Sequence, residues 1–177
     1  MRVITGTARG MKLEAPYGLD VRPTSDKIKE AVFSAVQFDL DGANVLDLFA
    51  GSGQLGIEAL SRGAKSAVFT DRSKKAVSTV IKNLEKTGFS AVSKVHFTDG
   101  LQYLRTHDEI FGIAFIDPPY GKNLIVPVLE ALKLESGGKA VCEHEADVEL
   151  PRAVGGLTLE KEYKYGNTRI SVYRNIT

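Results

Sequence analysis

Residues 44–56 read NVLDLFAGSGQLG, an apolar run followed by a glycine-rich G-x-G-x-x-G loop. The apolar run predicts a buried strand over 44–49, and residues 54–62 have the spacing of a helix. Glycines at the junction let the backbone turn sharply and approach a ligand, while the helix start presents free N–H groups. The segment therefore predicts a strand–loop–helix unit that binds a nucleoside cofactor.

The same alternation of strands and helices continues on the carboxyl side of this unit. Apolar runs predict further strands at 66–70, 94–98, 111–116 and 139–142, and amphipathic spacing predicts helices at 74–87, 100–106 and about 123–133. Alternating strands and helices indicate an α/β fold with a parallel sheet. The last two β-like segments, 157–165 and 168–174, are joined by Gly166-Asn167 and predict an antiparallel hairpin.

The amino-terminal segment has a different pattern. Two short β-prone pieces, 2–5 and 11–14, predict a small hairpin. A helix then begins after Pro23, with Thr24 or Ser25 as its cap, because Pro23 favours extended backbone before it and short polar side chains cap helices. We therefore divide the chain into an N-terminal hairpin extension, residues 1–25, and a main domain, residues 26–177.

Composition limits the class of protein. The chain has 177 residues, 43% hydrophobic, with 23 basic and 22 acidic residues, which is typical of one globular domain and excludes wholesale disorder. It contains no apolar run long enough to span a bilayer and no signal-peptide core. The single cysteine, Cys142, excludes an internal disulfide. These features lead us to expect a cytoplasmic protein without a membrane partner.

Charge is distributed unevenly along the chain. Residues 61–96 carry eight basic and two acidic residues, whereas residues 97–149 carry four basic and ten acidic residues. Solvated helix faces explain such a pattern, and nucleic-acid binding is also compatible with it.

Three aspartates accompany the glycine loop. Asp71 follows the next strand, twenty residues after Gly51, where a carboxylate can accept both hydroxyls of a ribose. Asp47 directly precedes the loop and would repel a pyrophosphate, so it favours a ligand with a cationic amino-acid end, such as S-adenosylmethionine. The alternative is that Asp47 only caps the loop. Asp99 follows the third strand and suits an adenine amine, although Asp99-Gly100 is also a common turn.

Asp117-Pro118-Pro119-Tyr120 follows the apolar strand 111–116. The prolines make a rigid corner at the carboxyl end of a strand, where open α/β sheets bind ligands. An acidic acceptor, a prolyl carbonyl and an aromatic ring together suit methyl transfer to the exocyclic amine of a flipped base. The alternative is a structural Pro-Pro turn.

These motifs resemble a known family. The segments 47–53 and 117–120 are similar to those of class I S-adenosylmethionine-dependent amino-methyltransferases. Residues 2–6, 9–10, 22–26 and 30–33, the continuation 55–64 and the ending 160–174 resemble bacterial 16S rRNA guanine-N2 methyltransferases of the RsmD type. The resemblance implies a Rossmann-like seven-stranded mixed sheet, its last strand antiparallel, with helices on both faces. One departure is Gln54, where a small residue is expected.

The resemblance also implies a role for each matching residue. The implied cofactor site consists of Asp47, Phe49, Ala50, Gly51, Gly53, Asp71, Arg72, Asp99 and Gly100. The implied catalytic residues are Asp117, Pro118 and Tyr120, and the implied substrate contacts are Arg9, Arg22, Thr24, Pro119 and Tyr120. The implied partner is ribosomal RNA, in the 30S subunit or an assembly particle, and the implied product is N2-methylguanine with S-adenosylhomocysteine.

Several alternatives stay open. The chain could methylate an adenine or cytosine amine in another RNA or in DNA, bind a cofactor without catalysis, or, least favoured, act as a nicotinamide dehydrogenase. His96, His107 and His144 show no metal-ligand spacing, so we expect no metal. Glu143-His144-Glu145 is interpreted as a solvated strand end. A monomer is expected by default.

Overall fold

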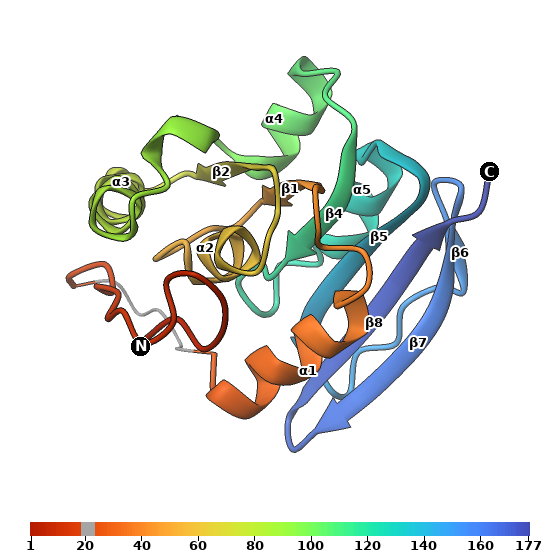
Figure 1. Cartoon of the computed structure of the whole chain (residues 1–177). Helices are drawn as coiled ribbons and strands as arrows, with labels where there is room; N and C mark the ends of the chain where they lie inside the picture. Colours follow the sequence, from red (N-terminus) through yellow and green to blue (C-terminus); the bar gives the residue numbers. More distant parts are fainter. Residues whose placement is uncertain (19–23) are drawn as a thin grey trace.

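An eight-stranded mixed sheet forms the centre of the computed structural model, which describes residues 1–18 and 24–177 (Figure 1). Its strand order is β3-β2-β1-β4-β5-β8-β7-β6. The first five strands run parallel, and β8 is antiparallel to both β5 and β7. The strands are β1 (Asn44–Asp47), β2 (Ser66–Asp71), β3 (Ser93–Phe97), β4 (Phe111–Ile116), β5 (Leu134–Glu145), β6 (Ala153–Val154), β7 (Leu157–Tyr165) and β8 (Thr168–Asn175).

Helices cover both faces of the sheet, as predicted. One buried cluster joins one face to α1, α2, α3 and the N-terminal segment, and a second cluster joins the other face to α4 and α5 (Figure 1). Every residue of β4 is buried, as expected for a strand covered on both sides. The helices are α1 (Asp26–Val36), α2 (Gln54–Ser61), α3 (Lys74–Thr87), α4 (Gly100–Thr106) and α5 (Ile125–Ala131), with a 3-10 turn at Ser90–Val92. None of the described helices is long and apolar enough to cross a membrane.

The expected α/β sheet with an antiparallel strand near its end is confirmed, although several elements differ from the expected ones; the strand expected at 44–49, for example, ends at Asp47. The helix expected at 123–133 covers only 125–131, because the chain becomes extended at Leu132. Strand β5 begins at Leu134, which pairs with Phe111, and not at residue 139 as expected. It extends to Glu145, where it pairs with β8. An eighth, two-residue strand, Ala153–Val154, pairs with the start of β7 through a Gly155-Gly156 turn.

The N-terminal hairpin forms only in part. A single bridge joins Arg2 to Lys12, and the amide of Gly10 donates to the carbonyl of Val3 at 2.8 Å. No longer ladder forms, because the amides of Ile4 and Thr5 donate to Glu58 and the amide of Ala8 donates to Ser61 Oγ.

The strand order reverses between β1 and β4. From β1 the chain moves to β2 and β3 on one side, and it returns to β4 on the other side of β1. Asp47 at the end of β1 pairs with Phe115, so Asp117 lies just beyond it at the end of β4. In open α/β sheets, such a reversal leaves a crevice at the carboxyl ends of the strands.

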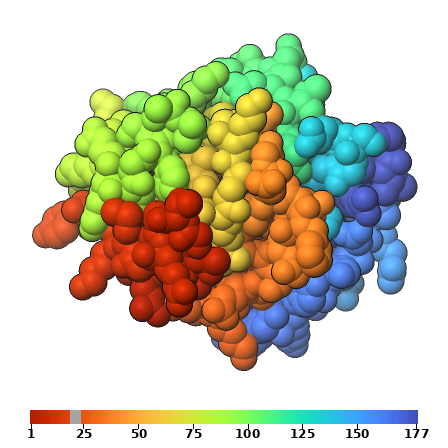
Figure 2. All heavy atoms as spheres, viewed as in Figure 1, coloured from red at the N-terminus to blue at the C-terminus, as the bar shows by residue number. Residues whose placement is uncertain are grey.

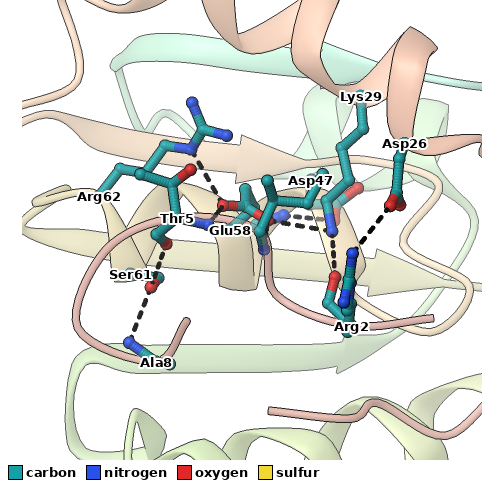
Figure 3. A network of polar contacts seen from close by, with 11 residues as sticks. Arg2, Thr5, Ala8, Asp26, Lys29, Asp47, Glu58, Ser61 and Arg62 are labelled. Atoms are coloured by element: carbon teal, nitrogen blue, oxygen red, sulfur yellow. Dashed lines mark hydrogen bonds and ion pairs between the residues drawn. The ribbon is translucent and has the colours of Figure 1, made fainter. Parts of the chain in front are cut away.

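A buried carboxylate anchors the N-terminal segment to the main domain (Figure 3). Glu58 of α2 is fully buried, and its Oε1 accepts from the Ile4 amide at 2.8 Å and from the Lys29 ammonium at 3.0 Å. Its Oε2 accepts from the Thr5 amide at 3.0 Å and from Arg62 Nε at 2.9 Å. Burial alone raises the pKa of Glu58, but these donors outweigh it and hold the pKa below its usual value.

Asn83 of α3 makes a second link. Its side-chain oxygen accepts from the Glu14 amide at 2.9 Å, and its Nδ2 donates to the Glu14 carbonyl at 2.9 Å and to the Ser52 carbonyl at 2.8 Å. Asn83 is fully buried. One amide group therefore connects the N-terminal segment to the glycine loop.

We predict that Glu58→Ala lowers the free energy of unfolding by about 3–5 kcal/mol, because it leaves the buried Lys29 ammonium without its counter-charge. Urea denaturation measures this loss, and hydrogen exchange should show faster exchange at the Ile4 and Thr5 amides. Glu85→Ala, at an exposed position on α3, serves as the control. A loss below about 1 kcal/mol for Glu58→Ala, the size expected of a surface ion pair, would contradict the prediction.

Candidate active site

A cavity of about 940 Å³ opens at the carboxyl ends of the parallel strands, beside the β1–β4 reversal. It is built from the loops that follow β1, β2, β3 and β4. Residues predicted from sequence line it from all four loops: Asp47, Phe49, Ala50, Gly51, Asp71, Arg72, Asp99, Gly100, Asp117, Pro118, Pro119 and Tyr120. The structure thus brings together one group from segments far apart in the chain.

The glycine loop turns from β1 into α2 as expected. Gly51 and Gly53 have positive φ angles of 58° and 81°, and the Gly53 amide donates to the Ala50 carbonyl at 2.7 Å. A Cβ on Gly56 would lie 2.3 Å from the Phe69 ring, so only glycine lets α2 pack this closely on β2. Gln54, which departs from the expected small residue, is buried and lines the cavity.

Asp47 is 2% exposed and lies beneath the loop. Its Oδ2 accepts from the Gly56 amide at 3.0 Å. Burial, with a smaller contribution from the negative charge of Asp71, raises the pKa of Asp47 to about 7 despite that hydrogen bond. Capping of the loop is therefore observed, but it does not compensate for the burial of the charge.

Asp71 and Asp99 hold the neighbouring loops. The two carboxylate oxygens of Asp71 accept from the amides of Gly51 at 2.9 Å and Ser73 at 2.8 Å, which joins the loops after β1 and β2. Asp99 caps α4, since its Oδ1 accepts from the Gln102 amide at 3.1 Å. Each carboxylate oxygen has a second lone pair, so these bonds leave capacity for a ligand in the cavity.

The Asp117–Tyr120 corner closes the other end of the cavity. Pro118 is buried, and the Tyr120 hydroxyl lies 3.3 Å from Thr168 Oγ1 at the start of β8. The amide of Gly121 donates to Glu145 Oε1 at 2.7 Å. The C-terminal hairpin and the end of β5 therefore fix the orientation of the corner.

A second, smaller cavity of about 220 Å³ lies on the other side of this corner. Its lining includes Glu143 and His144, which are 4% and 1% exposed. The interpretation of Glu143-His144-Glu145 as a solvated strand end is therefore wrong for two of the three residues. β8 covers this end of β5, and His144 Nε2 lies 2.8 Å from Ser171 Oγ.

The predicted substrate contacts are less defined. Arg9 is exposed on the N-terminal segment, and Thr24 is buried just before Ser25, whose hydroxyl caps α1. Arg22 lies outside the described residues. Sequence reasoning missed Glu58 and Asn83, the buried side chains that fix the N-terminal segment.

Two of the histidines lie together. The rings of His96 and His107 have centroids 5.5 Å apart, and both contact Tyr103. Among the residues that the structure describes, no group of three His, Cys, Asp or Glu side chains could hold a metal ion. Cys142 is fully buried, and burial raises the pKa of its thiol.

The lining of the cavity determines which ligands fit. The ionisable residues of the lining are four aspartates, Asp47, Asp71, Asp99 and Asp117, and two cationic residues, Arg72 and Lys122. This acidic lining disfavours a pyrophosphate and favours a ligand with cationic and hydroxyl groups. The rigid corner with its carboxylate and aromatic ring lies in the same cavity, so a second, planar ligand can meet the first one there.

Known proteins provide an independent comparison. The family model described as Conserved hypothetical protein 95 matches residues 1–174. A Bacillus subtilis (strain 168) protein named "Putative rRNA methyltransferase YlbH" is 41% identical over 98% of each chain. The Escherichia coli (strain K12) protein named "Ribosomal RNA small subunit methyltransferase D" is 30% identical, over 98% of this chain and 89% of that protein.

A solved structure agrees with these relatives. The protein described as "Putative methyltransferase yhhF from Escherichia coli" superposes with a TM-score of 0.85 at 29% identity, covering 98% of this chain and 97% of that one. The chain therefore belongs to the Conserved hypothetical protein 95 family, the RsmD-type methyltransferases, whose methyl donor is S-adenosylmethionine.

Proposed function

We propose that this chain transfers a methyl group from S-adenosylmethionine to the exocyclic N2 amine of a guanine in 16S rRNA. The observation that carries the proposal is the Asp117–Tyr120 corner, which lines the same cavity as the glycine loop. The name of the Escherichia coli relative specifies the small ribosomal subunit, and this supports the choice of RNA.

The acidic lining fits the methyl donor. S-adenosylmethionine carries an ammonium group at its methionine end, and a cation beside the buried Asp47 would stabilise the ionised carboxylate. Asp71 offers acceptors for the ribose hydroxyls, and Asp99 an acceptor for the adenine amine. We assign the cofactor site to Asp47, Phe49, Ala50, Gly51, Gly53, Asp71, Arg72, Asp99 and Gly100.

The corner residues would act on the target base. The donor supplies an electrophilic methyl group on a sulfonium sulfur, and the guanine amine is a weak nucleophile because its lone pair is delocalised into the ring. The Asp117 carboxylate and the Pro118 carbonyl would accept hydrogen bonds from the two N–H groups of the amine. These bonds would orient its lone pair toward the methyl group. The amine proton would leave along the hydrogen bond to Asp117. Positioning, rather than a strong base, would account for most of the rate.

The remaining contacts would hold the RNA around the base. Tyr120, fixed by Thr168, would stack on the flipped guanine beside Pro119. Arg9, Arg22 and Thr24, in or next to the N-terminal extension, would contact the substrate, and the two arginines suit phosphates. We propose a cytoplasmic monomer that acts on the 30S subunit or an assembly particle and needs no metal.

We predict that Asp117→Ala lowers kcat by about 100-fold or more, because the amine loses the acceptor that orients it. The test is mass spectrometry of N2-methylguanosine in 16S rRNA from cells that lack the gene and from complemented cells. The wild type should restore one equivalent, and Asp117→Ala should not, while it still binds S-adenosylhomocysteine.

Asp41→Ala, an exposed acid at the opposite end of β1, is the matched control and should restore the methyl group. Unchanged N2-methylguanosine in the absence of the gene would refute the rRNA guanine assignment and direct the search to other amines in RNA or DNA. Full activity of Asp117→Ala would remove Asp117 from the mechanism.

We predict that the affinity for S-adenosylhomocysteine rises about tenfold between pH 6 and pH 8. The pKa of Asp47 is raised to about 7 in the folded protein, so its carboxyl group is mostly neutral at pH 6. The ammonium group of the ligand favours the ionised form of Asp47, so binding below pH 7 must release a proton. By the same sign, the ligand-free protein loses stability as pH rises from the usual aspartate pKa of 3.8 to about 7, because in this range the carboxyl group ionises in the unfolded chain but stays mostly neutral in the folded one.

Calorimetry from pH 5.5 to 8.5 in two buffers measures both the affinity and the released proton. Asp47→Asn keeps an acceptor for the Gly56 amide and should bind weakly, with no pH dependence in this range. A wild-type affinity that stays constant across this interval would contradict the assignment of Asp47.

We predict a preference for a ribonucleoprotein particle over protein-free 16S rRNA. A chain of this size binds naked RNA through few contacts, so its affinity should be weak and sensitive to salt. Methyl incorporation into 30S subunits, assembly intermediates and protein-free 16S rRNA tests this at equal RNA concentration. Equal rates on all three would contradict it.

A further inference from the structure

The exposed face of α3 carries a concentration of positive charge. Seven of its residues face solvent, and these include four lysines and one acid: Lys74, Lys75, Ser78, Ile81, Lys82, Glu85 and Lys86. None of the four lysines forms an ion pair with another described residue. Within the described part of the chain, no acidic side chain neutralises this charge.

An aromatic side chain lies within this face. Phe97, the last residue of β3, is 55% exposed, and Ile81 beside it is 43% exposed. The Lys74 ammonium lies 5.6 Å from the centre of the Phe97 ring. Together with Lys82, these residues line a shallow groove of about 450 Å³ between α3 and the edge of the sheet.

The groove adjoins the methyltransferase cavity. Arg72 lines that cavity and precedes Lys74 by two residues, and Asp99 lines it and follows Phe97 by two residues. On the other side, α3 is bound to the N-terminal segment through Asn83 and Glu14. Figure 2 shows the N-terminal segment, in red, packed against the yellow-green region that contains α3.

We propose that this α3 face, defined by Lys74, Lys75, Lys82, Lys86 and Phe97, is a second RNA-binding surface. The lysines contact phosphates of the RNA backbone, and Phe97 stacks on an unpaired base. The inference rests on the proposed function, because it assumes that the substrate is RNA.

Charge and shape both favour RNA as the occupant. Lysines around an exposed aromatic ring are the combination that single-stranded RNA segments use, because phosphates need cations and unstacked bases need a flat apolar surface. The helices on the opposite face of the sheet offer no comparable positive charge, since α4 carries Arg105 alone and α5 carries only the acid Glu130. The contrast orients a polyanion toward the α3 side of the cavity.

The test uses the full chain with Lys75→Glu/Lys82→Glu. Both positions are exposed, and an acid in the first turn of α3 suits the helix dipole, so the fold is retained. The control is Lys65→Glu/Lys161→Glu, which makes the same change of charge at two exposed positions outside the α3 face. Binding to 30S subunits and to protein-free 16S rRNA is measured at several salt concentrations, together with methyl transfer.

We expect the α3 variant to bind RNA at least about tenfold more weakly than the wild type at physiological salt. The slope of log affinity against log salt concentration should be smaller in magnitude by about two. Its kcat at saturating RNA and its affinity for S-adenosylhomocysteine should equal those of the wild type. Phe97→Ala should weaken binding several-fold with an unchanged salt slope, because it removes stacking and no charge.

Equal losses in the α3 variant and the control would overturn the proposal, because they would reflect net charge alone. A loss on 30S subunits with none on protein-free RNA would also overturn it and assign the face to a ribosomal protein. Failure of the proposed function itself is recognised separately: the wild type would then form no N2-methylguanosine in either substrate.

Discussion

The parallel pairing of β1 with β4 is the constraint on which the site depends. Because the chain leaves β1 on one side and returns to β4 on the other, no crossover covers the ends of these two strands. Asp47 and Asp117 follow the two strands and line one cavity, although seventy residues separate them in sequence. The glycine loop and the Asp117–Tyr120 corner would not meet in a sheet with another strand order.

Electrostatics inside this cavity differ from those of the rest of the molecule. Four aspartates line it, and backbone amides donate hydrogen bonds to three of them: Gly56 to Asp47, Gly51 and Ser73 to Asp71, and Gln102 to Asp99. Amides stabilise a carboxylate without adding a full positive charge, so the lining remains acidic. Glu58 shows the opposite solution, because two cationic side chains and two amides compensate it completely within the core. Carboxylates that only amides bind can still attract a cationic group of a ligand, whereas Glu58, which two cations bind, serves only to stabilise the fold.

The N-terminal segment is part of the same physical unit. Val3, Ala8 and Leu13 are buried in the cluster that contains α1, α2 and α3. Glu58 fixes its beginning and Asn83 its end, and Asn83 also holds the carbonyl of Ser52 in the glycine loop. An extension proposed to contact RNA is thus connected by one buried amide to the loop proposed to hold the cofactor. The α3 face lies on the outer side of the same helix that carries Asn83.

Local sequence determined the type and order of the elements, since periodicity and capping are properties of neighbouring residues. It located α2, α3, α4 and β4 within a residue, and it identified every aspartate of the cavity, because each one ends or closely follows a strand. It could not determine that Glu143 and His144 are buried, since β8 covers them from a distant part of the chain. Nor could it assign Glu58 or Asn83, which look like ordinary polar helix residues. Their roles exist only because tertiary packing brings Ile4, Thr5 and Glu14 onto α2 and α3, where backbone amides without a local partner need buried acceptors.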